Sequence, residues 1–386
     1  MRVCIVYDCL FPYTVGGGER WYRSLAERLA ADGHEVTYLT LRQWDRHERP
    51  DAGAGVRVVT AGPRMALYTA GGRRRILPPL VFGVGVLWRL LRSGRRYDVV
   101  HTSAFPYFSL LAAALARRLG GFELVVDWFE VWSDSYWRDY LGAAGGRVGA
   151  FVQRVCARVR QRAFCFSELH AARLRDEGLR GEVTVLRGLY ADSGELSPVR
   201  EADPLVLFAG RLIPEKQAPL AVAAIAIARE RIVGLRGEFL GDGPERAALD
   251  AAIVEHDLTG VVSAPGFAAA DTVDAEMRRA LCLLLPSRRE GYGMVVVEAS
   301  ARGTPSIVVA GEDNAATELI VESVNGTVAA SSDPREIAEA IVRIHEAGLA
   351  LRQSTARWFV ENAESLSLAH SLRVVLERYG SGRAPG

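Results

Sequence analysis

The sequence predicts an α/β protein of two Rossmann-like domains, each a doubly wound parallel sheet, that face each other across a cleft. Three observations lead to this class. The chain has 386 residues, more than one hydrophobic core usually supports. Short apolar runs alternate with longer helical patterns almost from end to end, which is typical of a parallel sheet covered by helices. A polar segment rich in helix and strand breakers, 192–204, interrupts this alternation near the middle.

The apolar runs predict the elements in order. In the first half we expect strands at Val3–Tyr7, Glu35–Leu41, Val56–Thr60, Val99–Thr102, Leu124–Asp127, Ala163–Ser167 and Val183–Leu186. In the second half we expect strands at Leu205–Ala209, Glu238–Gly241, Val261–Pro265, Cys282–Pro286 and Ser306–Ala310. The predicted parts are an N-terminal domain (1–190), a linker (191–204), a C-terminal domain (205–365), and a C-terminal helix with a tail (366–386), the helix being a candidate to cross back to the first domain.

Composition excludes some classes of protein. Five scattered cysteines without a Cys-x-x-Cys pair argue against a disulfide framework and a structural zinc site, and favour the reducing cytoplasm. The first residues run straight into an apolar strand and show no secretory signal. The net charge is +1, but residues 1–195 carry 28 Arg against 20 acidic residues, or +8, which leaves −7 for the rest. This asymmetry fits an anionic ligand between the halves, a basic face on anionic lipid, or ordinary surface charge; we expect no nucleic-acid partner.

One apolar segment, 76–88, has arginines on both sides. It is too short to span a bilayer, which needs about 20 apolar residues. We expect a helix packed on the sheet, and the alternative is an interfacial helix that contacts an anionic membrane.

The strongest chemical signal begins at the loop Phe208–Gln217. It carries Arg211 and Lys216, and Lys216 is the only lysine among 47 basic residues. A guanidinium and an ammonium at a strand end suit the negative charge that develops on a nucleotide diphosphate leaving group. The alternative, an ordinary solvated loop, is disfavoured by the single lysine.

A second signal is the pair Glu290 and Glu298 around Gly291-Tyr-Gly293. Glycines let the backbone approach a ligand closely, and the start of the next helix offers N–H groups to phosphate. Glu298 can accept hydrogen bonds from two ribose hydroxyls, which leaves Glu290 to face the transferred sugar.

Three motifs, Gly210-Arg-Leu-x-x-Glu-Lys216, Gly241-Asp-Gly-Pro244 and Glu290-x7-Glu298 followed by Ala-Ser-Ala-Arg-Gly-Thr-Pro305, resemble the retaining GT-B glycosyltransferases of family four, the group 1 type. The resemblance covers nearly the whole chain. It implies that Arg211 and Lys216 hold the donor diphosphate and Glu298 the ribose. It further implies donor contacts from Glu290 and a set of glycine-rich backbone positions: Gly17, Gly241, Gly291, Tyr292, Gly293 and Met294.

The first half contributes looser signals. The loop before the first helix, with Gly16, Gly17 and Gly18, is neither a Walker A motif nor a dinucleotide fingerprint. It is either a tight turn or, by the resemblance, a backbone approach to donor phosphate and acceptor. His101 is expected to end a strand and project into the cleft; a structural role is the alternative to donor binding or proton movement.

The stretch 127–140 concentrates aromatic residues and carboxylates. Trp128, Glu130 and Trp132 are candidates to contact the acceptor, and aromatic packing under a loop is the equal alternative. Related enzymes often have histidine where Phe129 stands, so a base at that position is in doubt.

Together these signals predict a retaining hexosyl- or N-acetylhexosaminyltransferase of EC class 2.4 that forms an α-glycosidic bond. A UDP-sugar is the favoured donor and GDP-mannose the next. The acceptor is a hydroxyl of a small natural product, lipid carrier or glycan intermediate. No cofactor or metal is expected, since no Asp-x-Asp motif lies at a plausible diphosphate site. Arginine and alanine richness suggests a bacterial genome of high GC content. The expected location is the cytoplasm, with peripheral contact at the inner membrane face left open. A nucleotide-sugar epimerase and a non-catalytic binding module are the alternatives.

Overall fold

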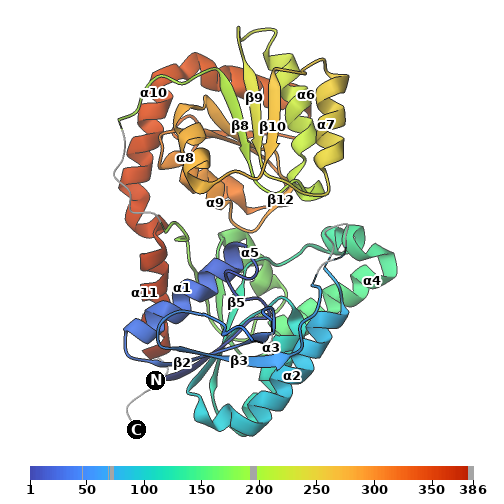
Figure 1. Ribbon diagram of the computed structural model, residues 1–386, viewed down its shortest axis with the longest axis vertical. Coiled ribbons are helices and arrows are strands. Elements are labelled where there is room, and N and C mark those ends of the chain that lie inside the picture. The colour runs from blue at the N-terminus through green and yellow to red at the C-terminus, as the bar shows by residue number, and fades with distance from the viewer. Residues whose placement is uncertain (46, 68, 70–73, 192–197, 381–386) are drawn as a thin grey trace. The chain divides into compact units, whose positions relative to one another are not determined.

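The computed structural model describes residues 1–45, 47–67, 69, 74–191 and 198–380. They form two compact units (Figure 1). The N-terminal unit comprises Met1–Leu189 and the chain from Ala369 onward, and the C-terminal unit comprises Tyr190–Leu368. Each unit contains a parallel sheet flanked by helices, which confirms the predicted fold class. Of the predicted linker, 192–197 lie outside the described residues.

The N-terminal unit is built on a sheet whose described strands follow the order β3-β2-β1-β4-β5-β6-β7. These strands are β1 (Arg2–Val6), β2 (Glu35–Leu41), β3 (Val56–Gly62), β4 (Val99–Ser103), β5 (Glu123–Trp128), β6 (Arg162–Cys165) and β7 (Val183–Val185). The helices are α1 (Gly17–Ala31), α2 (Leu77–Ser93), η1 (Gly94–Arg96), α3 (Tyr107–Gly120), α4 (Asp134–Ala157), α5 (Glu168–Asp176) and α11 (Leu368–Gly380). Strand order reverses between β1 and β4, so the switch point lies at their carboxyl ends.

The apolar segment predicted to pack on the sheet forms α2. Phe82, Val86 and Leu90 are buried in the core of the N-terminal unit, and the helix contacts β2 and β3. Pro78 and Pro79 lie in its first turn, where the backbone N–H that proline lacks would have no helical partner. The expectation of a helix that packs on the sheet is therefore confirmed.

The C-terminal unit repeats the pattern in the strand order β10-β9-β8-β11-β13-β15. Its main strands are β8 (Leu205–Ala209), β9 (Arg236–Leu240), β10 (Val262–Gly266), β11 (Cys282–Leu285), β13 (Ser306–Val309) and β15 (Gly326–Ala329). A separate short pair is β12 (Arg289–Glu290) with β14 (Asp313–Asn314). The helices are η2 (Pro214–Lys216), α6 (Ala218–Ala228), α7 (Arg246–Glu255), α8 (Ala270–Arg279), α9 (Met294–Ser300), η3 (Ala315–Leu319) and α10 (Pro334–Leu366). Here the switch point lies between β8 and β11.

Most predicted strand ends differ from the observed ones by one or two residues, for local reasons. For example, β6 ends at Cys165 because Ser167 caps the next helix, its hydroxyl accepting the His170 N–H at 3.2 Å. Three strands of the C-terminal unit, β12, β14 and β15, were not predicted. Two of them have only two residues each, too short for an apolar periodicity to show.

Candidate functional site

The first group of candidate residues lies at the switch point of the C-terminal unit. β8 ends at Ala209 and leads into the loop with Arg211 and Lys216, while β11 ends at Leu285 and leads to Glu290. The Lys216 ammonium forms an ion pair with the Glu290 carboxylate, and the two side chains are only 18% and 11% exposed. Arg211 is exposed on the same loop. The fold thus brings together two predicted site residues that are 74 positions apart in the sequence.

The Arg211 loop packs closely against the end of the neighbouring strand at Gly241. The φ of Gly241, 149°, belongs to the region that favours glycine, and an added Cβ would lie 1.9 Å from the Gly210 carbonyl oxygen. The Leu212 N–H donates to the Asp242 carbonyl at 2.9 Å. Glycine at 241 therefore lets the backbone next to Arg211 come close, and this packing explains the glycine without any contact to a ligand.

The chain after Glu290 turns sharply into α9. Gly293 has a φ of 100°, and a Cβ there would lie 2.7 Å from an atom of η3. Tyr292 is buried, while Gly291 is half-buried. The side chain of Tyr292 therefore packs inside the unit, and only its backbone remains a candidate for ligand contact.

Met294 and Glu298 lie one turn apart on α9, and both are half-buried. Residues four apart share a helix face, so both occupy the same side of α9. Because α9 begins directly after the Glu290 segment, Glu298 lies in the same compact unit as the Lys216–Glu290 pair, on the next helix along the chain.

Asn314 fixes the Glu290 segment and was missed in the sequence. Its side chain is 1% exposed, and its amide donates to the carbonyl oxygens of Ser287 and Val309 at 2.9 and 2.7 Å. Its oxygen accepts the Ala316 N–H at 3.1 Å. Asn314 is also the register partner of Glu290 in the β12–β14 pair. A polar residue just after the strand Ser306–Val309 was the available signal.

His101 does not end its strand, contrary to the expectation, because β4 continues to Ser103. The imidazole is fully buried: Nε2 lies 2.8 Å from Asp127 Oδ1, and Nδ1 is hydrogen-bonded to the Tyr379 hydroxyl of α11. Burial, reinforced by the Asp127 carboxylate, raises the pKa of Tyr379, so this phenol keeps its proton. Trp21 donates to the other Asp127 oxygen at 2.7 Å. His101 thus belongs to a buried polar network inside the N-terminal unit.

The glycine loop forms the start of α1. Gly17 is exposed, and an added Cβ at Gly18 would lie 2.7 Å from the Tyr7 hydroxyl. A Cβ at Gly16 would lie 2.4 Å from a carboxylate oxygen of Glu19, which is 8% exposed. A carboxylate therefore already occupies the space beside Gly16, and a group bound there meets this oxygen as well as backbone.

The aromatic stretch divides into core and half-exposed parts. Trp128 is fully buried and its indole donates to Gln161 at 2.9 Å, so it is corrected from an acceptor contact to a core residue. Trp132 and Glu130 are half-buried, and the Trp132 indole donates to Glu130 at 2.8 Å. The side chain of the buried Gln153 accepts a hydrogen bond from the Trp132 N–H at 3.0 Å and donates one to the Trp132 carbonyl oxygen at 2.9 Å. Glu130 and Trp132 remain candidates for ligand contact.

A buried acid at the switch point of the N-terminal unit was also missed. Asp8 follows β1, is fully buried, and forms an ion pair with Arg74. Its Oδ1 has no hydrogen-bond partner among the residues that the structure describes. Its position directly after the first strand was the signal in the sequence.

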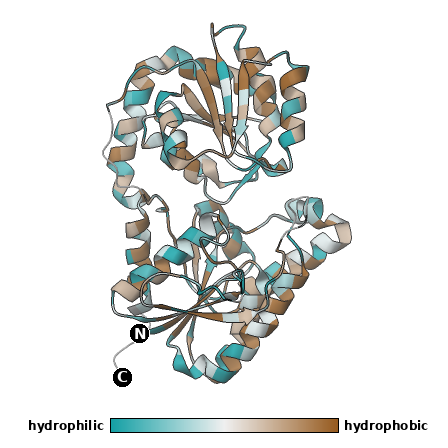
Figure 2. Cartoon of the chain, viewed as in Figure 1, coloured by the Kyte–Doolittle hydropathy of each residue, from teal (hydrophilic) through white to brown (hydrophobic). Residues whose placement is uncertain are grey.

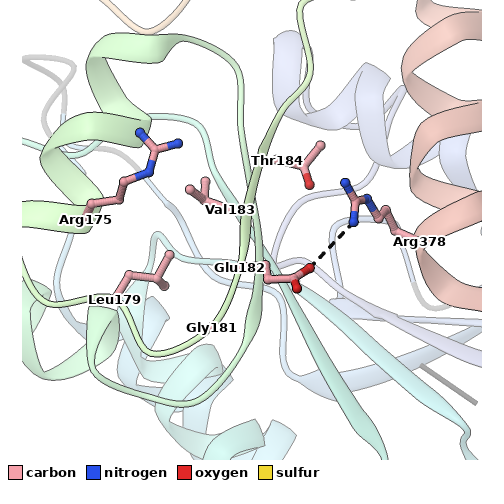
Figure 3. A pocket seen from close by; sticks show the side chains of 7 residues that line it. All are labelled: Arg175, Leu179, Gly181, Glu182, Val183, Thr184 and Arg378. Carbon is pink, nitrogen blue, oxygen red and sulfur yellow. Dashed lines mark ion pairs between the residues drawn. The ribbon is translucent and has the colours of Figure 1, made fainter. Parts of the chain in front are cut away.

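An open hollow of about 500 Å³ lies beside the edge strand β7. Figure 3 shows Arg378 of α11 paired with Glu182 on one side, at 3.6 Å, and Arg175 and Leu179 on the other. None of the predicted site residues lines it, so it is not part of the candidate site. Within the described ranges, no group of three or more His, Cys, Asp or Glu side chains is arranged to hold a metal ion.

Two doubly wound units, the second with a cation–carboxylate pair at its switch point, define the GT-B class of nucleotide-sugar enzymes. The fold agrees with solved structures of that class. Anabaena Alr3699/HepE in complex with UDP has a TM-score of 0.73 and 17% identity, covering 99% of this chain and 100% of that one. Sucrose-phosphate synthase from Thermosynechococcus elongatus has a TM-score of 0.76 and 18% identity, covering 98% of each chain.

The chain belongs to the GT-B glycosyltransferases: residues 195–365 match the model for glycosyl transferases group 1, and 16–188 match that for a glycosyl transferase 4-like domain. It is 31% identical to 2-deoxystreptamine glucosyltransferase of Streptomyces kanamyceticus, over 46% of this chain and 47% of that protein. It is also 31% identical to a GDP-mannose-dependent phosphatidylinositol monomannoside mannosyltransferase of Mycolicibacterium smegmatis, over 36% of this chain and 37% of that protein. These matches thus span less than half of each relative.

Proposed function

We propose that this protein is a retaining glycosyltransferase that moves a hexosyl or N-acetylhexosaminyl group from a nucleotide-diphosphate sugar to an acceptor hydroxyl, forming an α-linkage. The observation that carries the proposal is the Lys216–Glu290 pair at the switch point of the C-terminal unit. Ligands of open α/β sheets bind at such points. The pair places an ammonium and a carboxylate group where a donor would present its diphosphate and its sugar hydroxyls.

Donor binding in this proposal exchanges ion-pair partners. A diphosphate replaces Glu290 as the partner of Lys216, and the exposed Arg211 on the same loop adds a second cation. The released Glu290 carboxylate then accepts hydrogen bonds from sugar hydroxyls. Glu298, on the helix that follows, accepts those of the ribose.

The proposed mechanism needs no nucleophile from the enzyme. By resemblance to the family, the acceptor oxygen attacks the anomeric carbon from the face that the leaving group vacates. The departing phosphate oxygen takes the acceptor proton. Lys216 and Arg211 stabilise the negative charge that grows on the diphosphate as the bond breaks, which lowers the barrier directly.

The relatives guide the choice of substrates. A UDP-sugar is the first donor to test, because the HepE structures hold UDP and UDP-glucose. GDP-mannose is second, because mannosyltransferases that depend on it are among the relatives. The acceptors to test are an aminocyclitol, an inositol lipid and a glycan intermediate, since the names of relatives point to all three.

The test is an assignment of product stereochemistry by proton NMR, with each donor offered to each acceptor. An α-linked product from an α-linked donor supports the proposal, and a β-linked product would overturn retention. Lys216→Ala should lose most turnover, whereas Arg231→Ala, which removes an exposed ion-paired cation of the same unit, should not. An epimerised donor formed without acceptor would favour the epimerase, although none of the relatives reported above is one.

A further inference from the structure

The solvent side of α2 is apolar, which is unusual for a surface helix. Its outward positions recur every three or four residues and are Leu77, Leu80, Val84, Trp88 and Leu91. Val84 is 70% exposed, Leu77 62% and Trp88 48%. The opposite side is buried in the N-terminal unit, so α2 is hydrophobic on both faces, as the colours along it show (Figure 2). We call the outward residues the α2 stripe.

Two neighbouring helices, α3 and α4, cover the same face of the sheet as α2. Gly83 of α2 packs against Phe108 of α3, and Gly94 lies beside Gly120, so the two helices run alongside each other. α2, α3 and α4 each connect strands in the same direction across the sheet, and right-handed connections place all three on one face. Further exposed apolar side chains on α3 and α4 are Leu115, Leu119, Val148, Phe151 and Val155.

The charged residues of α2, η1 and α3 all have one sign, whereas α4 also carries Asp134 and Asp139 near its start. No Asp or Glu occurs in the sequence within 74–97, 107–120 or 140–161. Arginines occur in all three segments: Arg74, Arg75, Arg89, Arg92, Arg95, Arg96, Arg117, Arg118, Arg147, Arg154, Arg158 and Arg160. Two of them lie over the Trp88 ring, with the Arg92 guanidinium carbon 4.1 Å and that of Arg89 5.2 Å from its centroid. An apolar stripe with a tryptophan and flanking arginines has the composition of a helix that lies in a membrane interface.

The absence of acidic residues from α2, η1 and α3 also decides between two occupants of this surface, a second copy of the chain and an anionic membrane. A two-fold dimer would bring the same surface of two copies together, and would therefore oppose arginine to arginine. An anionic lipid surface instead offers phosphates to the arginines and an acyl boundary to the α2 stripe. Since no helix in the described part of the chain is long and apolar enough to cross a bilayer, contact would be peripheral.

We infer that the α2 face of the N-terminal unit docks on an anionic membrane, with α2 lying in the plane of the interface. The α2 stripe enters the boundary between headgroups and acyl chains, and the arginines contact lipid phosphates. This inference goes beyond glycosyl transfer, because docking requires neither donor nor acceptor. It can therefore fail or succeed independently of the proposed function.

The test is co-flotation of the full-length protein with phosphatidylcholine vesicles, with and without phosphatidylglycerol. We expect binding at least about tenfold stronger to the anionic vesicles, and release by high salt. Trp88→Glu should weaken that binding about tenfold or more, and Val84→Glu should do the same at a second exposed position. Phe267→Glu is the matched control: Phe267 is 88% exposed on the C-terminal unit, and its replacement should leave vesicle binding unchanged.

Circular dichroism establishes that each variant is folded before binding is compared. Absence of binding to anionic vesicles, or equal binding by wild type and both α2 variants, would overturn the inference. Sedimentation in the absence of lipid tests the other occupant: a dimer that Trp88→Glu dissociates would assign the α2 stripe to a second copy and would equally overturn it.

Discussion

Asn314→Ala should uncouple the Glu290 segment from the sheet. The substitution removes the three hydrogen bonds to Ser287, Val309 and Ala316 inside a site that is 1% exposed. At about 1 kcal/mol net for each bond, the free energy of unfolding should fall by roughly 3 kcal/mol. Because Asn314 is the register partner of Glu290, the carboxylate should also lose its fixed position, and a displacement of about 1 Å can cost up to roughly 100-fold in rate.

Urea denaturation measures the first effect, and kcat/KM for donor, corrected for the folded fraction, measures the second. Asn325→Ala is the control, because Asn325 is equally buried and makes bonds of the same kind to Val321 and Leu319, at 2.7 and 2.8 Å. It should cost about 2 kcal/mol and leave kcat/KM per folded molecule unchanged. If Asn314→Ala kept its stability, or lost stability with the same kcat/KM as Asn325→Ala, the positioning role would be refuted.

Three further predictions concern backbone strain, pH and metal. Gly241→Ala, whose Cβ would lie 1.9 Å from a backbone carbonyl oxygen, should lower the free energy of unfolding by roughly 3 kcal/mol and weaken nucleotide binding. Gly260→Ala, with open space around its Cβ, should lower the free energy of unfolding by only about 1 kcal/mol in the same thermal denaturation experiment. Burial alone would raise the pKa of Asp274, but hydrogen bonds from Arg278 and Arg302 lower it. The stability that the ionised Asp274 adds to the folded state is therefore present above about pH 4 and is lost as the pH falls further. The difference in free energy of unfolding between wild type and Asp274→Asn should therefore become smaller as the pH is lowered. Turnover should persist in chelator, and its loss would indicate a required metal.

The sequence was sufficient for the sheet because buried parallel strands are continuous apolar runs, whatever surrounds them. The run Leu205–Ala209 is observed with the predicted bounds. The site residues beside such strands were also visible in part, since Lys216 and Glu290 follow strands that adjoin the switch point.

Contacts between distant segments could not be predicted in this way. The surroundings of His101 depend on Tyr379, 278 residues further along, so only the fold shows that the imidazole is enclosed. Trp128 and Trp132 lie in the same short aromatic stretch, yet one is in the core and the other is half-buried. Trp128 ends the buried strand β5, whereas Trp132 lies in the loop that follows, and this difference is clear only once the end of β5 is known.

Calorimetric titration of UDP, GDP, ADP and dTDP into wild type and Lys216→Ala tests the donor site most directly. We predict that one nucleotide binds wild type with a Kd of about micromolar strength, and that the variant loses roughly 2–3 kcal/mol of that affinity. Arg231→Ala should bind as wild type does. Binding of no nucleotide, or equal binding by wild type and Lys216→Ala, would contradict a diphosphate site built on the Lys216–Glu290 pair.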